Sequence, residues 1–192
     1  LWSIHAAQAA EDGLDAKGIA RLCARLGIQV RMVEALTAWP SGDRAAIDAE
    51  ARPVFALAAE VGAEEVLAVS LDETSIDLDV AATGFAYLCD LAARHGLRVG
   101  LEFLPWTAIP DLRTAWTLVE RAGRGNGGLV LDSWHWQRQP GGPDFDVLRS
   151  IPPDRIHVLQ INDAPRAPDG ALADETMTRR LLPGDGDIDL RG

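Results

Sequence analysis

Hydrophobic and polar residues alternate along the chain in two periods, one helical and one extended. Helical stretches such as "DLRTAWTLVERAG", residues 111–123, carry apolar residues three and four positions apart. Four such stretches end in a glycine that a short β-rich run follows, and these glycines are Gly27, Gly62, Gly96 and Gly123. A fifth β-rich run, "RIHVLQIND", lies at residues 155–163. Strands that alternate regularly with helices predict a parallel sheet.

Alternation with a period of two separates the faces of the predicted strands. In residues 97–105 one face is wholly apolar, and the opposite face carries Glu102 near the end of the run. Two later runs divide in the same way and end in Asp132 and Gln160. The same alternation puts His157 on the side that faces the helices, which predicts a structural role for it.

An apolar face suits an outer layer of helices, and inward polar residues at strand ends are typical of the catalytic rim of a (β/α)-barrel. A doubly wound open sheet is the alternative. No glycine-rich phosphate-binding fingerprint follows any predicted strand, so the sequence favours the barrel.

Three polar strand ends therefore converge on one rim: Glu102, Asp132 and Gln160. Two carboxylates and an amide oxygen suit a hard divalent ion, Mg²⁺, Mn²⁺ or Co²⁺. The alternative for any one of them is a strand-end group that bonds only backbone or solvent. Glu34 ends the run "IQVRMVEA" and could reach the same rim, but its strand parity is ambiguous.

The stretches "GLEFLP", "LVLDSWHW", "IHVLQIND" and "LLPGDGDIDL" resemble the xylose isomerase-like TIM-barrel superfamily of sugar isomerases and epimerases. Inosose dehydratase and 3-dehydroshikimate dehydratase are relatives within it. The resemblance covers nearly the whole chain and implies a single (β/α)8-barrel domain over residues 1–192. It assigns strands two to seven to this sequence and leaves the first and last strands outside it. The natural polypeptide is then expected to be longer, or to be completed by another chain.

The same resemblance implies one divalent ion held by four residues of the last four barrel strands. Glu102, Asp132 and Gln160 match the first three ligands, and the fourth, a glutamate, is expected beyond Gly192. His135 matches a histidine that contacts substrate, and Arg166 matches a substrate-contacting arginine of some members. Gln in place of His as third ligand is the pattern of the dehydratase branch.

These matches imply a metal-dependent isomerase or epimerase that forms an enediolate from a sugar-like polyhydroxy carbonyl compound. Glu102 and His135 are its expected catalytic residues. Trp106 and Trp134 are expected to form an aromatic wall against the substrate, with packing under loops as the alternative. A dehydratase of the 3-dehydroshikimate or inosose type is the second possibility, and a non-catalytic sugar-binding barrel is the third.

The composition limits the classes of molecule that the chain is expected to bind. The 192 residues are 47% hydrophobic, as in an ordinary globular domain, and the net charge of −11 disfavours nucleic acid and anionic membranes. No apolar run reaches the length of a membrane span. The two cysteines, Cys23 and Cys89, lie in predicted helices and imply no disulfide, which favours the cytoplasm. A small-molecule substrate and a possible homodimer are the expected partners. The polar stretch 164–174 is predicted to be a loop near the site.

Overall fold

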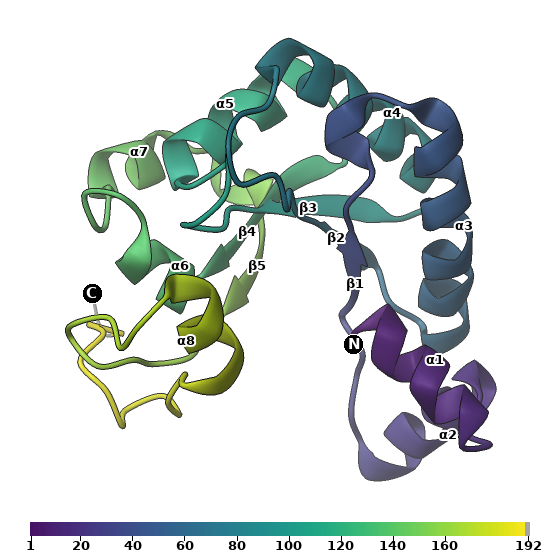
Figure 1. Cartoon of the computed structure of the whole chain (residues 1–192). Helices are drawn as coiled ribbons and strands as arrows, with labels where there is room; N and C mark the ends of the chain where they lie inside the picture. The colour runs from purple at the N-terminus through teal and green to yellow at the C-terminus, as the bar shows by residue number, and fades with distance from the viewer. Residues whose placement is uncertain (191–192) are drawn as a thin grey trace.

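A computed structural model describes residues 1–190, and its centre is a parallel sheet (Figure 1). Five strands follow one another in the order β1-β2-β3-β4-β5, and each pairs in parallel with the next. This sheet confirms the predicted barrel architecture and all five predicted strands. The strands are β1 (Met32–Leu36), β2 (Glu65–Ala68), β3 (Arg98–Glu102), β4 (Gly127–Asp132) and β5 (Ile156–Gln160). Trp2 adds an isolated parallel bridge to Glu34 of β1.

Of the four long helices, α3, α4 and α5 connect successive strands, and α2 precedes β1. Figure 1 shows α3, α4 and α5 along the outer side of the curved sheet. Three of them end at a glycine in the left-handed conformation, because a residue without a Cβ reverses the chain there at little steric cost. The helices are α2 (Ala16–Leu26), α3 (Arg44–Val61), α4 (Leu78–Ala93) and α5 (Leu112–Ala122). Shorter elements are α1 (Ser3–Glu11), α6 (Ser133–Arg138), α7 (Phe145–Ser150), α8 (Leu172–Thr178) and the 3₁₀ turns η1 (Trp39–Ser41) and η2 (Pro153–Arg155).

The apolar side chains of the strands fall into two clusters, one on each face of the sheet. The large outer cluster lies against the helices and includes Val99, Leu101 and Leu129. The small inner cluster consists of Met32, Leu67, Val69, Leu104 and Val130. The predicted division of β3 and β4 into an outer and an inner face is therefore confirmed.

His157 is the exception, because β5 contains an irregularity in its register. Ile156 pairs with Leu129 and Val158 pairs with Val130, so β5 has one residue more than β4 at this point. Such a bulge reverses the alternation locally. His157 consequently lies on the inner face, with Nδ1 2.6 Å from Glu65 Oε1. The prediction that it faces the helices was wrong.

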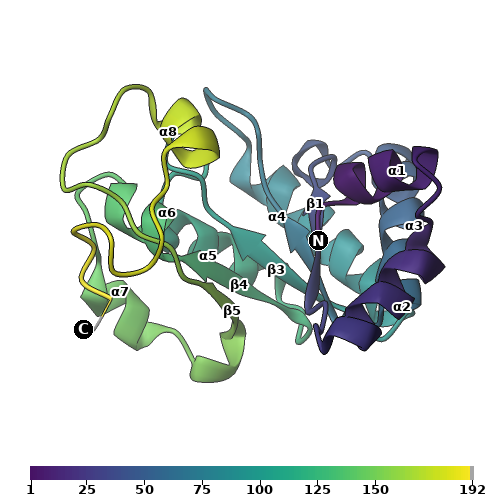
Figure 2. The ribbon, with the colours of Figure 1, turned by 90° about the horizontal axis from the view of Figure 1, so that it is seen from below.

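The segment after β5 folds back beside α6, as Figures 1 and 2 show for α8. Asp163 forms an antiparallel bridge with Leu181, and its carboxylate accepts hydrogen bonds from backbone N–H groups on both sides of this return. The predicted loop 164–174 is shorter than expected, since α8 already begins at Leu172. Within residues 1–190, no helix is both long and apolar enough to cross a membrane.

Candidate functional site

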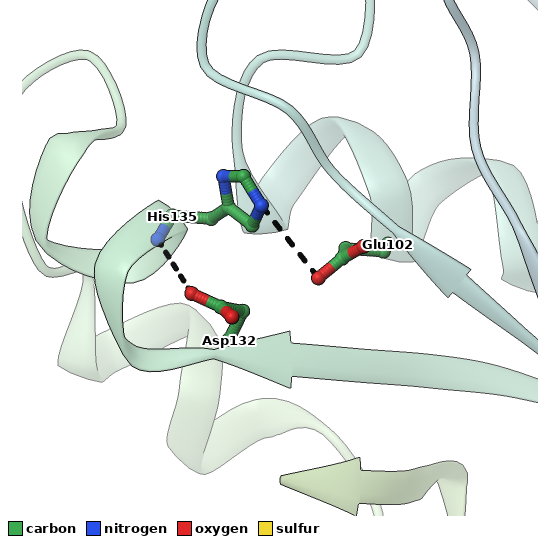
Figure 3. Close-up of side chains that lie close together, drawn as sticks. All are labelled: Glu102, Asp132 and His135. Carbon is green, nitrogen blue, oxygen red and sulfur yellow. Dashed lines mark hydrogen bonds and ion pairs between the residues drawn. The ribbon is translucent and has the colours of Figure 1, made fainter. Parts of the chain in front are cut away.

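Three buried side chains meet at the carboxyl ends of β3 and β4 (Figure 3). Glu102 ends β3, Asp132 ends β4, and His135 lies in the first turn of α6. One ligand atom from each lies within 4.8 Å of the others, a spacing that could hold a metal ion. The structure thus brings together two of the three predicted metal ligands and the predicted substrate-contacting histidine.

The D-x-x-H spacing has a local cause. Asp132 is the N-cap of α6, and its Oδ1 accepts hydrogen bonds from Trp134 N at 2.8 Å and His135 N at 3.1 Å. Capping therefore fixes the His135 backbone beside the strand end, and Figure 3 shows its imidazole turned toward Glu102. The distance from His135 Nε2 to Glu102 Oε1 is 3.7 Å. Asp132 Oδ2 is left for partners at the rim.

Gln160, the third predicted ligand, completes this group from β5, where it pairs with Asp132. Its amide can take two orientations. In one, Nε2 donates to Glu102 Oε1 at 3.1 Å and to Asp132 Oδ2 at 3.0 Å. In the other, Oε1 occupies that position and Nε2 donates to Glu34 Oε1 at 3.4 Å. Glu34, whose parity the sequence left ambiguous, therefore points toward the same rim.

The second orientation fits a divalent ion. In this orientation Gln160 Oε1 lies 3.1 Å from Glu102 Oε1 and 3.0 Å from Asp132 Oδ2, which is repulsive unless a proton or a cation lies between these oxygens. Oxygen ligands about 2.1 Å from an ion such as Mg²⁺ and at right angles to one another lie about 3 Å apart. Glu102, Asp132 and Gln160 could accordingly hold an ion, with His135 as a further donor within reach.

The charges of the site shift the protonation of its residues. Burial, with the nearby carboxylates of Asp132 and Glu34, raises the pKa of Glu102 well above its ordinary value. Burial likewise raises the pKa of Glu34. For His135, burial lowers the pKa to about 3, although Asp132 acts in the opposite direction. At neutral pH His135 is therefore an uncharged imidazole.

Arg180 is a site residue that sequence reasoning missed. Its guanidinium lies 2.8 Å from Asp132 Oδ2 and 3.2 Å from His135 Nε2, and it stacks 5.3 Å above the Trp134 ring. It lies just beyond the end of α8, in the run "RRLLPG" (residues 179–184), which has neither strand nor helix periodicity. Only the tertiary return of this segment brings Arg180 to the rim.

The other predicted substrate residues separate into two groups. Trp106 and Trp134 surround His135, with ring centroids 5.5 and 5.2 Å from the imidazole. Trp134 is fully buried and donates to Glu175, so it also packs as a core side chain. Arg166 is exposed, and none of the contacts of residues 1–190 joins it to the metal-ligand group. The roles of all three toward a substrate stay predictions.

Comparison with known proteins places these features in context. The family described as "Xylose isomerase-like TIM barrel" matches residues 4–192. A 3-dehydroshikimate dehydratase of Pseudomonas aeruginosa is 31% identical over 186 residues, which is 92% of this chain and 28% of that protein. An inosose isomerase of Bacillus subtilis is 30% identical over 129 residues, 66% of this chain and 42% of the relative.

A solved structure has a similar fold. The IOLI protein with a binding zinc atom superimposes with a TM-score of 0.78 at 26% identity, over 94% of this chain and 68% of that chain. This chain thus spans only part of the proteins that it matches.

Proposed function

The chain belongs to the xylose isomerase-like TIM-barrel family, and from that premise we propose that it is a divalent-metal-dependent enzyme acting on a polyhydroxy carbonyl compound. The reaction begins with removal of the proton next to the carbonyl. The observation that carries this proposal is the group of three ligand oxygens from Glu102, Asp132 and Gln160 at the rim. Such a group has no evident use in a barrel that only needs to fold.

Bound Mn²⁺, Mg²⁺, Co²⁺ or the Zn²⁺ of the IOLI relative would polarise the substrate carbonyl and favour loss of the neighbouring proton. Glu102 is the residue that we assign to this proton, because its carboxylate is buried at the rim beside His135 and burial raises its pKa, which makes it a stronger base. His135 is uncharged and would hydrogen-bond a substrate oxygen without adding a positive charge. Trp106 and Trp134 would bound the substrate on the side of His135.

Arg180 supplies the positive charge of the site. It now pairs with Asp132. Once Asp132 is engaged by an ion, Arg180 would exchange this partner for an anionic or hydroxyl group of the substrate. Arg166, the arginine that the family resemblance indicates, would need a movement of its exposed side chain to do the same.

Two outcomes can follow the first step. Reprotonation of the enediolate on a neighbouring carbon or on its other face would make the protein an isomerase or epimerase, like the inosose isomerases that it resembles. Loss of a β-hydroxyl from the same intermediate would make it a dehydratase. The longer match to the P. aeruginosa 3-dehydroshikimate dehydratase, together with Gln160 as third ligand, favours the dehydratase outcome.

The test measures three things separately: the need for a metal ion, the removal of the proton next to the carbonyl, and the identity of the product. Protein stripped with EDTA and reloaded with Mn²⁺ would be incubated in D₂O with inosose or with 3-dehydroshikimate. We expect Mn²⁺-dependent deuterium incorporation next to the carbonyl of the isomerised product, or formation of an aromatic dihydroxybenzoate by dehydration. Glu102→Gln and Asp132→Asn should abolish both, whereas the exposed Glu64→Gln should not.

Metal and ligand binding without either product would favour a non-catalytic sugar-binding barrel. No metal binding at all by the wild-type chain would refute the proposed mechanism.

A further inference from the structure

An amide side chain is a metal ligand only when its oxygen faces the ion. In the site above, the Gln160 amide is opposed on one side by Glu102 and Asp132 and on the other by Glu34. We propose that Glu34 is a positioning residue, which accepts a hydrogen bond from Gln160 Nε2 and thereby turns Gln160 Oε1 toward the ion. This inference rests on the metal site of the proposed function and extends it to a residue of β1.

Hydrogen-bond chemistry makes the two orientations mutually exclusive. An ionised carboxylate only accepts, and an amide donates from nitrogen and accepts at oxygen. When Nε2 faces Glu102 and Asp132, the amide oxygen takes the place on the other side, 3.4 Å from Glu34 Oε1. Both of these oxygens are acceptors, so no hydrogen bond forms between them. When Nε2 faces Glu34, it donates to Glu34 Oε1 at 3.4 Å, and the amide oxygen points to the two ligand carboxylates, where it faces only acceptors until an ion or a proton lies between them. Glu34 therefore favours the orientation that an ion requires.

The backbone of Glu34 is fixed where this contact needs it. Its N–H donates to Leu1 O at 2.9 Å, and it forms the parallel bridge with Trp2. The contact with Gln160 then joins β1 and β5, the first and last strands of the described sheet, across 126 residues of sequence.

Glu34 is placed to act through Gln160 and not as a ligand itself. The group of acidic and histidine side chains whose atoms lie within 4.8 Å of one another comprises Glu102, Asp132 and His135, and Glu34 lies outside it. Partners that orient a ligand from behind commonly change metal affinity by about 10–100-fold when they are removed.

The test measures Mn²⁺ affinity by calorimetry on EDTA-stripped protein, so it does not depend on turnover. Glu34→Leu removes the acceptor and should weaken Mn²⁺ binding by about 10–100-fold. Glu34→Gln keeps a carbonyl oxygen that can accept from Gln160 Nε2, and it should stay within about threefold of the wild type. Glu64 is an exposed carboxylate just before β2, so Glu64→Gln is the matched control and should leave the affinity unchanged.

Repeating the Glu34→Leu substitution in the Gln160→Glu variant distinguishes an effect on the orientation of residue 160 from direct binding of the ion by Glu34 or from support of the fold. In Gln160→Glu the ligand is a carboxylate, which presents an oxygen in either orientation. Adding Glu34→Leu to this variant should therefore weaken Mn²⁺ binding by less than about threefold, or strengthen it by removing a like charge. A loss in this background as large as in the wild type would overturn the inference, because it would mean that Glu34 acts on the ion or on the fold directly.

Equal affinity of the wild type and Glu34→Leu would overturn the inference and leave the metal site intact. Absence of Mn²⁺ binding by the wild type would instead overturn the metal site. Circular dichroism of the ion-free proteins checks folding, and Glu34→Met takes the place of Glu34→Leu if the leucine variant does not fold.

Discussion

Removal of Glu175 tests whether one buried ion pair holds the segment that carries Arg180. Glu175 lies on α8 and is fully buried. Its Oε1 accepts from Arg138 Nε at 3.1 Å, from Arg138 NH2 at 2.6 Å and from Trp134 Nε1 at 3.1 Å. Its Oε2 accepts from Asp169 N at 3.0 Å. This carboxylate therefore connects α8 and the preceding loop to α6.

The expected loss in the free energy of unfolding follows from the groups that lose their partner when Glu175 is replaced. In Glu175→Leu, the guanidinium of Arg138 stays buried without its counter-ion, and a change of this kind usually destabilises by about 3–5 kcal/mol. Trp134 Nε1 also loses its acceptor, which by itself costs about 1–3 kcal/mol. Arg138 keeps the carbonyl oxygens of Pro165 and Arg166, which limits the loss. We therefore expect a decrease of about 3 kcal/mol in the free energy of unfolding.

The assay is urea denaturation followed by circular dichroism, with a double-mutant cycle. Arg138→Met and Glu175→Leu should each be strongly destabilising alone, whereas the double variant should be far less so, because an apolar pair of similar size removes both unpaired charges. The exposed pair of Arg149 and Asp146 is the control, and its removal should change stability by less than about 0.5 kcal/mol. Strictly additive losses, or a loss under about 1 kcal/mol for Glu175→Leu, would refute the reasoning.

Two further predictions concern the site histidine and the interior of the sheet. Because burial lowers the pKa of His135 to about 3 from its ordinary 6.5, the unfolded chain binds a proton that the native state does not between these pH values. This group should remove about 2 kcal/mol of stability as the pH falls from 7 to 5, and His135→Phe should abolish that part of the slope in urea titrations at the two pH values. An unchanged slope would contradict the assignment. Gly128→Ala would bring a Cβ to 2.3 Å from His157 Nε2 and 2.6 Å from Arg155 O, and should destabilise by about 1–3 kcal/mol. At Gly125, where an added Cβ meets no atom within 4 Å, alanine should be tolerated, and equal melting temperatures for the two variants would argue against the close approach.

The parts of the structure that the sequence predicted are those governed by short-range periodicity. Alternation along β3 and β4 determines which residues face the helices, and the parallel direction of the two strands then brings their carboxyl ends, with Glu102 and Asp132, to the same edge. Glycine at the helix ends marked the helix-to-strand transitions. Each of these inferences depends on residues within one element or its immediate neighbour.

The features that escaped prediction depend on contacts between distant segments. The bulge that turns His157 inward is an irregularity in the pairing of β5 with β4, and no residue type within β5 indicates it. Arg180 reaches the rim only because Glu175 and Asp163 hold a return of the chain that has no periodicity of its own. Glu34 could not be assigned to a face, and its place was determined by pairing with Trp2 and by its contact with Gln160.

Two polar clusters on the same inner face show why one of them is the better candidate for function. Toward the amino ends of the strands, Glu65 has His157 Nδ1 at 2.6 Å from one oxygen and Arg98 at 3.0 Å from the other, so its charge is compensated by protein groups. At the carboxyl ends, Asp132 Oδ2 accepts from Arg180 and from Asn162 Nδ2, each at 2.8 Å, and burial raises the pKa of Glu102.

A fold can fill inward positions with apolar residues, as it does with Val130 on β4 and with Leu104 just after β3. In the second cluster, His135 Nδ1 has no hydrogen-bond partner among the described residues, and Gln160 Oε1 faces two carboxylate oxygens when Nε2 donates to Glu34. Natural sequences tolerate such local conflicts mainly where a ligand resolves them. The unpartnered imidazole nitrogen and the acceptors around Gln160, more than the identity of any one residue, therefore support the proposal that this end of the sheet binds a cation.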